Sequence, residues 1–510
     1  MSSSERQKIL VDVPRGMCAR NFLQQGIVSD LARDYDVSVL STFADDPAFA
    51  EAFADVSHVQ NDVRLVATGI VRRALRRVVD RVYHSFRFRD IARRVHLRSF
   101  TMMLELQLRH EFSRYLVGEC IYRTLLVDYV RDLAERLFSR VSVPPALPVV
   151  DDVRLVLFTH VYYEGIQGLI AYARARGIKT VGFVHSWDNL NTKGVLLHKL
   201  DRLLVWNDYM KDLVIRCYPE YSEDEILVTG SPTFDVYHDA DAVLPFEEFR
   251  TEIGFDPGRE KLVTFVLGSP TIYPLQDVVL SRFAARIASG ELGPIRLVVR
   301  FEPNFIVRPF YAEYRKAIEA VTAQHGFIHV SYPTNADSSA ENLGRWERTH
   351  DRAALFLPSA LKYSDAVVNT ASTTSVQAAI FDTPIVSMFF NHDELDRDFF
   401  QSHEMMAFYQ DHYHELVWKT GGTELARSLD DLIQKTRAYL LDPSLDRHER
   451  RQMVTAVCGG TNTGSREKIV QAVRGCIEDP RPVQFRYSRR PVRARVNSDR
   501  PVGFKQGNRI

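Results

Sequence analysis

The chain has 510 residues, which is too long for one ordinary hydrophobic core and indicates two or three domains. Its hydrophobic (45%) and charged (25%) fractions are those of an average soluble protein, which excludes disordered, collagen-like and disulfide-scaffold chains. Lys+Arg and Asp+Glu both number 65, so no net charge attracts nucleic acid. We expect a folded, multidomain protein without a nucleic-acid partner.

The cysteines and the N-terminus indicate the compartment. The five cysteines are scattered and lack CxxC spacing, which predicts neither a disulfide framework nor a zinc site. The first apolar stretch, 9–13, is too short for the core of a signal peptide, and no other uncharged apolar run reaches the length of a bilayer. We therefore expect a cytoplasmic protein without a transmembrane segment.

The first half of the chain alternates between strand and helix patterns. An apolar run at 8–13 ends in a Pro/Gly turn, and a helical pattern then leads to a second strand at 37–40. The same order returns later, with strands at 153–158, 180–184 and 202–206 and a helix at about 165–176. This alternation predicts a parallel, doubly wound sheet.

A second strand and helix series follows a segment rich in Gly, Pro and Asp at 230–246, which we interpret as a linker because helical periodicity lapses there. Its strands are expected at 262–268, 295–300, 327–333, 365–369 and 384–390. The sequence thus predicts two Rossmann-like domains, at 1–235 and 236–480.

Two segments concentrate basic charge. A helical insertion is expected at about 68–137, and within it 72–98 carries ten arginines against two aspartates along an amphipathic pattern. This helix is either a solvated helix packed on the sheet or a docking face for an anionic membrane surface. The tail at 481–510, with nine Arg/Lys against one acid, predicts an extended or disordered basic arm. Peripheral attachment to the inner face of the membrane is one hypothesis.

The familiar nucleotide and metal signatures are absent. No GxGxxG follows a strand, and the glycine-rich segment 459–465 lacks the lysine that a P-loop places before its Ser. The Asp-x-Asp triplets at 239–241 and 396–398 and the pair His412/His414 lack further ligands of convincing spacing. We expect neither a bound metal nor a cofactor.

The densest polar cluster is 185–194 (HSWDNLNTKG), directly after the strand at 180–184. Ligands of open α/β sheets bind outside the carboxyl ends of strands, where this loop must lie. His185 and Asp188 are a candidate general base and its orienting carboxylate, in either assignment, and Lys193 is a candidate for phosphate or carboxylate. The alternative is an Asx-rich turn around a buried Trp187.

In the second half, Arg300 and Glu302 follow a strand, and the hydroxyl-rich segment 369–377 joins a strand to a helix. Backbone N–H groups at a helix N-terminus and a nearby arginine suit a diphosphate. The alternatives are a plain N-capping run and a surface ion-pair arginine. The donor-binding candidates are Gly268, Ser269, Arg300, Glu302, Ser372, Thr373, Thr374 and Gln377.

Several of these motifs together resemble a known family. The stretch VTGSPTFD at 228–235 resembles the TG-(N/S)-P segment between the domains of GT-B glycosyltransferases. With SWDNLNTKG, DRLLVWND and SDAVVNTASTTSVQAAIFDTPIV, it resembles bacterial surface-polysaccharide glycosyltransferases related to the CDP-glycerol glycerophosphotransferases, from about Lys8 to Ile477. The resemblance implies a donor domain and an acceptor domain that face a central cleft.

The resemblance also implies roles for individual residues. His185 is similar to the His of the family's WHG…K loop, and Arg300 to the Arg of its RxHP element, where Glu302 replaces the His. Gln377 stands where GT-B donor domains commonly place a Glu on the ribose. The candidates for the acceptor side are Gly16, Arg20, Trp187, Asn189 and Lys193.

The function that follows as an expectation is glycosyl transfer from a nucleotide-activated donor, the co-substrate, to a glycan or lipid-linked acceptor in surface-polysaccharide biosynthesis. Three alternatives stay open. They are a CDP-alditol phosphotransferase, a nucleotide-sugar 2-epimerase and a non-catalytic scaffold of envelope assembly.

Overall fold

The computed structural model describes residues 6–60, 152–162, 166–187, 189–192, 196, 198–218, 220–268, 273, 276–302, 312–333, 352–390, 416–460 and 464–481. The expected basic insertion at 68–137 lies outside the described residues, as does the tail after 481. Asp188, Lys193 and Ser269 also lie outside them.

The first sheet has seven parallel strands in the order β3-β2-β1-β4-β5-β6-β7. Its central strands are buried on both faces and are almost wholly apolar, as parallel strands under helices require. The strands are β1 (Lys8–Val13), β2 (Asp36–Ser41), β3 (Ser57–Gln60), β4 (Val153–Phe158), β5 (Lys179–Phe183), β6 (Arg202–Val205) and β7 (Ile226–Val228).

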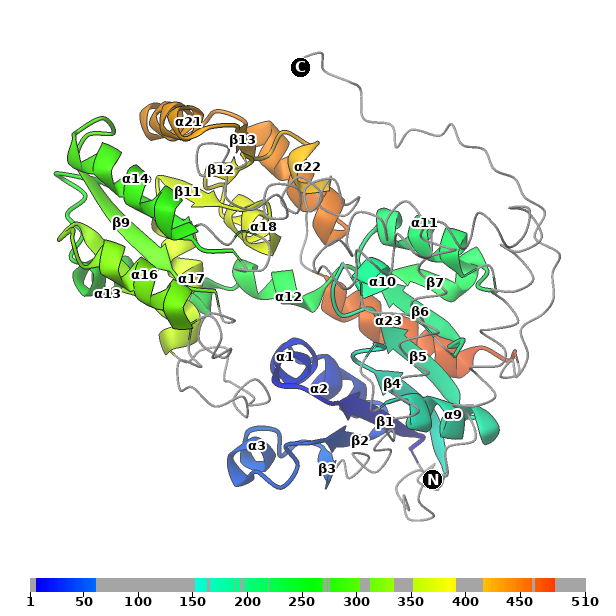
Figure 1. Ribbon diagram of the computed structural model, residues 1–510. Helices are drawn as coiled ribbons and strands as arrows, with labels where there is room; N and C mark the ends of the chain where they lie inside the picture. Colours follow the sequence, from blue (N-terminus) through cyan, green and yellow to red (C-terminus); the bar gives the residue numbers. More distant parts are fainter. Residues whose placement is uncertain are drawn as a thin grey trace.

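The second sheet has six parallel strands in the order β10-β9-β8-β11-β12-β13. They are β8 (Lys261–Val266), β9 (Ile295–Arg300), β10 (Ile328–Ser331), β11 (Ala366–Asn369), β12 (Ile385–Met388) and β13 (Glu424–Ala426). Figure 1 shows the two sheets, each with its own helices, as separate units. The expected α/β architecture of two Rossmann-like domains is confirmed.

Helices follow the strands in both units. Those of the first unit are α1 (Gly16–Cys18), the π-helix η1 (Ala19–Gln24), α2 (Ile27–Ala32), α3 (Pro47–Ala52), α9 (Gln167–Ala175), α10 (Asn189–Thr192), α11 (Asp208–Cys217) and η6 (Glu223–Glu225). Those of the second are α13 (Phe246–Ile253), α14 (Gln276–Ala288), α16 (Ala312–Thr322), α17 (Arg352–Tyr363), α18 (Thr373–Ile380), α21 (Leu429–Leu441) and α22 (Arg447–Cys458).

The segment between the sheets, interpreted above as a linker without helical structure, contains three short helices: α12 (Pro232–Asp235), η7 (Val236–His238) and η8 (Ala240–Ala242). Ser231 caps α12 by accepting a hydrogen bond from the Thr233 N–H, and Pro232 occupies the first turn, where its missing N–H costs nothing. Each helix is about one turn long, too short to give a periodic pattern.

The chain crosses between the two units twice, and the crossings touch. Gly230 lies on the first crossing and Gly459 on the second, both with positive φ (77° and 79°). A Cβ on Gly230 would lie 2.9 Å from the Cys458 carbonyl oxygen, and one on Gly459 would meet the Trp206 carbonyl. Both positions therefore require glycine, for backbone conformation and for space.

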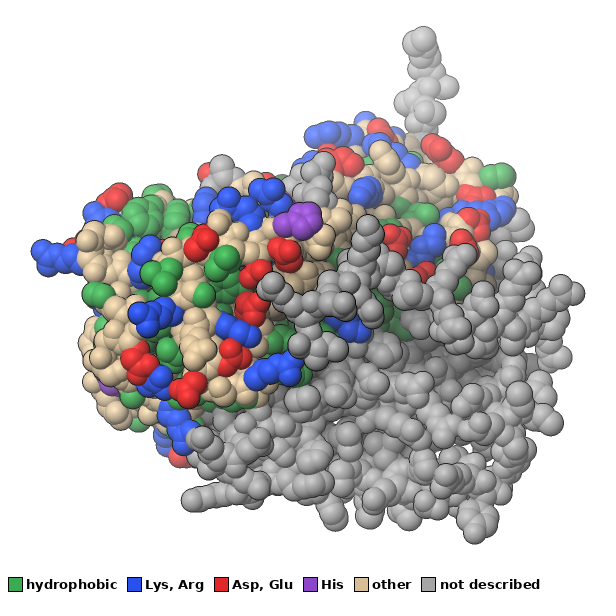
Figure 2. Space-filling model, turned by 90° about the horizontal axis from the view of Figure 1, so that it is seen from above, with side chains coloured by type: hydrophobic (Ala, Val, Ile, Leu, Met, Phe, Trp, Pro, Cys, Tyr) green, Lys and Arg blue, Asp and Glu red, His purple; other side chains and the backbone are tan. Residues whose placement is uncertain are grey.

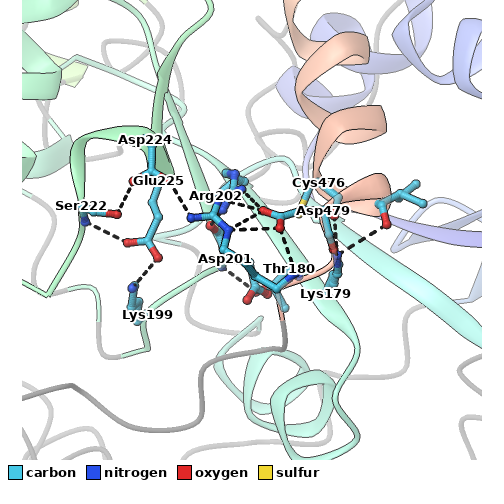
Figure 3. Close-up of polar contacts among 12 residues, drawn as sticks. Lys179, Thr180, Lys199, Asp201, Arg202, Ser222, Asp224, Glu225, Cys476 and Asp479 are labelled. Atoms are coloured by element: carbon cyan, nitrogen blue, oxygen red, sulfur yellow. Dashed lines mark hydrogen bonds and ion pairs between the residues drawn. The ribbon is translucent and has the colours of Figure 1, made fainter.

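The last helix, α23 (Ser465–Glu478), returns to the first unit, where it contacts α2, β4, β5 and β6 (Figure 1). Figure 3 shows how its end is held: Lys179 Nζ donates to the Cys476 carbonyl (2.8 Å), and Arg202 pairs with Asp479. The boundary at 235/236 stays a prediction, but this helix, expected with the second domain, packs on the first sheet.

On the face seen in Figure 2, basic and acidic side chains are interspersed over the described surface of the molecule. This agrees with the balanced composition of the whole chain. Within the part of the chain that the structure describes, no helix is long and apolar enough to cross a bilayer.

Candidate functional site

The carboxyl edge of the first sheet brings together three loops that are far apart in sequence. Asp12 of β1 pairs in register with Phe158 of β4, which pairs with Gly182 of β5. The loops that leave these neighbouring strands carry Arg15, His160 and His185. Because β1 and β4 are the strands at which the chain order reverses, this edge is the position where open α/β sheets bind ligands.

His185 lies deep in this edge, with 5% of its surface exposed. Its ring stacks on that of His160, with centroids 4.9 Å apart and planes 7° from parallel. Burial, and next the charges of His160, Arg20 and Arg15, lower the pKa of His185 well below its usual value. His185 is therefore neutral at pH 7, as a general base must be, and its buried Nδ1 has no hydrogen-bond partner among the described residues.

His160 is a site residue that the sequence analysis missed. Its Nδ1 accepts a hydrogen bond from the Tyr162 N–H (3.3 Å), so the proton lies on Nε2 whenever the ring is neutral. The signal was available, because His160 follows β4 by two residues just as His185 follows β5. The pairing of the two rings, however, depends on strand order, which no local pattern gives.

Arg20 and Gly16 lie in the loop and helices after β1. Gly16 is buried in α1, and Arg20 is half-buried in η1, a π-helix, a rare form that is frequent at functional sites. Arg20 Nε donates to the Asn21 amide oxygen (3.2 Å), and Asn21 donates to Thr233 Oγ1 of α12 (2.8 Å). The π-helix is thus fastened to the connection between the two units.

Trp187 and Asn189 form the body of the loop after β5. Trp187 is 4% exposed and stacks on Trp206, with ring centroids 6.4 Å apart. The Asn189 amide oxygen accepts the Ser186 N–H (3.0 Å) and closes the turn. These contacts fit the Asx-rich turn around a buried Trp, and an acceptor role for either residue stays a prediction.

Tyr237, on η7 between the units, is a second residue that the sequence analysis missed. It is 9% exposed, and its ring packs edge-on against Phe381 (5.8 Å). Burial raises the pKa of Tyr237 to about 12, while the charges of Arg20 and Arg300 act in the opposite direction. Its hydroxyl therefore lies within electrostatic range of an arginine from each carboxyl edge.

Arg300 ends β9 and is 7% exposed. Its Nη1 donates to Ser331 Oγ (2.8 Å) and to the Tyr332 carbonyl (2.5 Å), both at the end of the neighbouring β10. These two bonds orient the guanidinium. Glu302 follows two residues later and is half-buried.

In the hydroxyl-rich turn before α18, several polar groups form hydrogen bonds with one another. Ser372 Oγ accepts the Thr374 N–H (3.3 Å), and Ser375 Oγ accepts the Ser372 N–H (3.3 Å), a reciprocal cap. Asn369 Nδ2 in turn donates to Ser375 Oγ (2.9 Å). The half-buried residues of this turn include three further donor candidates, Thr373, Thr374 and Gln377.

Gly268, after β8, lies next to the turn before α18. Its N–H donates to Gln276 Oε1 (2.6 Å), and Gln276 Nε2 donates back to its carbonyl (2.9 Å). A Cβ at this position would lie 2.6 Å from Thr370 Oγ1. The loops after β8 and β11 therefore touch at the place where the strand order of the second sheet reverses.

A hollow lies beside the two crossings, lined by Thr229, Phe234, Asp235, His238, Ser465 and Lys468 among others. The Asp235 carboxylate accepts the backbone N–H of Ser465 (3.1 Å) and so caps the start of α23. These polar groups connect α12, between the units, with the start of α23. Among the described residues, no three His, Cys, Asp or Glu side chains cluster closely enough to hold a metal ion.

The comparisons with known proteins define a fold class. No family model matches the chain, and no curated protein matches it in sequence. A Listeria monocytogenes protein assigned as a UDP-N-acetylglucosamine 2-epimerase is similar in structure, with a TM-score of 0.51 at 11% identity over 93% of this chain and 97% of that chain.

A Neisseria meningitidis UDP-GlcNAc 2-epimerase bound to UDP-GlcNAc gives a TM-score of 0.50 at 10% identity, over 92% of this chain and 99% of that chain. A further UDP-N-acetylglucosamine 2-epimerase gives 0.50 at 12% identity, over 94% and 98%. The protein thus has the GT-B architecture. The resemblance to the CDP-glycerol glycerophosphotransferases stays a prediction.

Proposed function

We propose that the protein transfers a sugar from a nucleotide-activated donor, bound at the second carboxyl edge, to an acceptor hydroxyl at the first. The observation that carries the proposal is the position of Tyr237: Arg20 from the first unit and Arg300 from the second both act on its hydroxyl. A hydroxyl between the units therefore lies within electrostatic range of a cation from each edge, which supports a reaction between two bound substrates.

The donor side is assigned to the second unit because its groups suit a diphosphate. Arg300 supplies a fixed cation, and the N-terminus of α18 supplies a partial positive charge beside hydroxyl groups. Gln377 is a candidate for a ribose hydroxyl. Because these groups can meet the charge of the phosphates, we propose that transfer needs no divalent metal.

The acceptor side is assigned to the first unit because its groups suit proton transfer. The neutral His185 can take a proton from an attacking hydroxyl through Nδ1, which has no partner in the described structure. Protein atoms cover Nδ1 here, so the mechanism requires that acceptor binding uncovers it. Asp188 stays the alternative base.

A second candidate, nucleotide-sugar 2-epimerisation, is favoured by the similarity to structures described as UDP-GlcNAc 2-epimerases. The two reactions differ chemically. Epimerisation at C2 breaks and remakes a C–H bond and needs no acceptor, whereas transfer breaks the bond between the anomeric carbon and the phosphate oxygen.

The experiment incubates the protein with UDP-, CDP- and GDP-sugars in D₂O, with and without mixed glycan and lipid-phosphate-linked acceptors, and follows the sugar by NMR and mass spectrometry. Acceptor-dependent release of the nucleotide supports transfer. Deuterium at C2 without acceptor supports epimerisation instead. A ligand at 100 times its Kd adds about 2.7 kcal/mol to the free energy of unfolding. If none of the nucleotides raises the Tm of the protein, both reactions are contradicted.

Membrane attachment belongs to the proposal as well. Each lysine or arginine near an anionic membrane contributes about 1 kcal/mol, so the arginine-rich segment 72–98 would hold the protein at such a surface at low salt. Flotation with vesicles of anionic and of neutral lipid tests this. Equal flotation with both kinds, or with neither, would contradict it.

A further inference from the structure

Arg20 is a half-buried cation on the π-helix η1. It forms no ion pair with any residue that the structure describes, and its hydrogen bond to Asn21 goes to a neutral amide. Its charge acts on both His185 and Tyr237. A guanidinium in such a place is a strong donor for carboxylate or phosphate oxygens.

Four titratable groups of this region that the structure describes are largely uncharged at neutral pH. Burial raises the pKa of Asp12 to about 8, and burial raises the pKa of the Cys18 thiol to about 12. The pKa of Tyr237 is also about 12, and His185 is neutral. The described side chains of the first carboxyl edge therefore form a positively charged wall.

Two neighbouring groups extend this wall. Arg15, an exposed residue at the start of the same loop, also acts on His185. His160 contributes an imidazole whose Nδ1 accepts the Tyr162 N–H, which makes Nε2 the nitrogen that carries the proton of the neutral ring. Guanidinium and imidazole donors are thus gathered at a single edge.

We propose that Arg20, with Arg15 and His160, binds a phosphate or carboxylate group of the acceptor, so that the acceptor is an anionic molecule. This inference rests on the proposed function. The phosphates of the donor are the other possible source of the same chemistry. The acceptor is favoured because Arg20 belongs to the same unit as His185 and its charge acts on that ring, and the second edge has its own cation, Arg300.

The test measures binding of inorganic phosphate by ³¹P NMR at constant ionic strength, to the full chain alone and to the chain saturated with whichever nucleoside diphosphate it binds. Arg20→Gln removes the charge and Arg20→Lys keeps it. Arg33→Gln is the matched control, since Arg33 is a largely exposed arginine of the same unit that pairs with Asp30. Circular dichroism and Tm establish that each variant is folded.

We expect phosphate to bind with and without nucleotide. The affinity for phosphate should fall at least tenfold in Arg20→Gln. It should be mostly kept in Arg20→Lys and unchanged in Arg33→Gln. Loss of phosphate binding once nucleotide is saturating would assign Arg20 to the donor and overturn the proposal. Unchanged binding in a folded Arg20→Gln would do the same. A protein that binds no nucleotide contradicts the proposed function, and the titration without nucleotide then decides the anion site separately.

Discussion

The two carboxyl edges of this protein share one architecture and differ in chemistry. The first gathers imidazoles and guanidiniums around His185, which is neutral because it is buried. The second gathers hydroxyls, an amide network and the N-terminus of α18 beside Arg300. Groups of the first kind move protons and bind charge, whereas groups of the second kind hold a phosphate in place.

Because of this difference, substitutions at the two edges should alter different properties. A change at the first edge should alter turnover and the affinity for an anionic acceptor, and a change at the second should alter nucleotide affinity. Tyr237, between the edges, should report on both.

The largest effect is expected for His185→Gln. Loss of a positioned base should lower turnover by roughly a hundred- to ten-thousand-fold while nucleotide affinity stays within about twofold. Initial rates and nucleotide titration measure the two quantities. His448→Gln, at an exposed histidine of α22, is the control and should behave as wild type. A His185→Gln enzyme with near-normal turnover would remove His185 from the reaction.

Asp12 gives a prediction about stability and pH. Burial raises the pKa of Asp12 to about 8, from about 3.9 in the unfolded chain. Asp12 therefore makes its full contribution to the free energy of unfolding below about pH 4, and this contribution is lost as the pH rises through 8. Asp12→Asn stays neutral at every pH. It should therefore gain on the order of 2 to 5 kcal/mol relative to wild type above about pH 8, with little difference near pH 4.

Urea unfolding of both proteins between these pH values measures the effect. The control is Asp36→Asn, at an exposed carboxylate on the neighbouring strand β2. If Asp12→Asn and Asp36→Asn show the same pH dependence as wild type, the Asp12 carboxyl is not held protonated by burial.

Gly268→Ala should weaken nucleotide binding several-fold. The new Cβ would lie 2.6 Å from Thr370 Oγ1 and would separate the loops after β8 and β11, at a cost typical of overpacking, about 1–3 kcal/mol. Gly326→Ala is the control, because a Cβ there meets nothing within 4 Å. Equal nucleotide affinities in the two variants would show that this contact does not shape the donor site.

The smallest effect is expected from removal of divalent metals. Because Arg300 and the N-terminus of α18 can meet the donor's phosphates, transfer rates in excess EDTA should equal those without it. The measurement is the initial rate with EDTA, with EDTA plus excess magnesium, and with manganese. Loss of activity that magnesium or manganese restores would assign part of the phosphate charge to a metal.

The sequence predicted the central strands well because burial on both faces makes their residues continuously apolar, as at Val153–Phe158, expected and observed with the same bounds. It missed β3, β7 and β13, which are edge strands of three or four residues. The three residues of β7 (ILV) and of β13 (ELA) are too few to show a pattern, and β3 (SHVQ) is mostly polar.

The candidate site was predicted only in part, for a related reason. His185 and Arg300 follow strong strands and could be placed at sheet edges from sequence alone. The stacking of His160 on His185 and the place of Tyr237 between two arginines depend on which strands are neighbours and on how the units meet. Those are properties of the tertiary structure and leave no local signal.

The central claim is that nucleotide binding belongs to the second edge and proton transfer to the first. Calorimetric titration of UDP, CDP and GDP into wild type, Arg300→Gln, His185→Gln and the control Arg296→Gln tests it most directly. Arg296 lies on the same strand and pairs with Glu260. We predict that Arg300→Gln loses at least tenfold in nucleotide affinity, as expected for a charge-assisted contact, while the other two variants bind as wild type. Nucleotide affinity lost in His185→Gln but kept in Arg300→Gln would contradict the account.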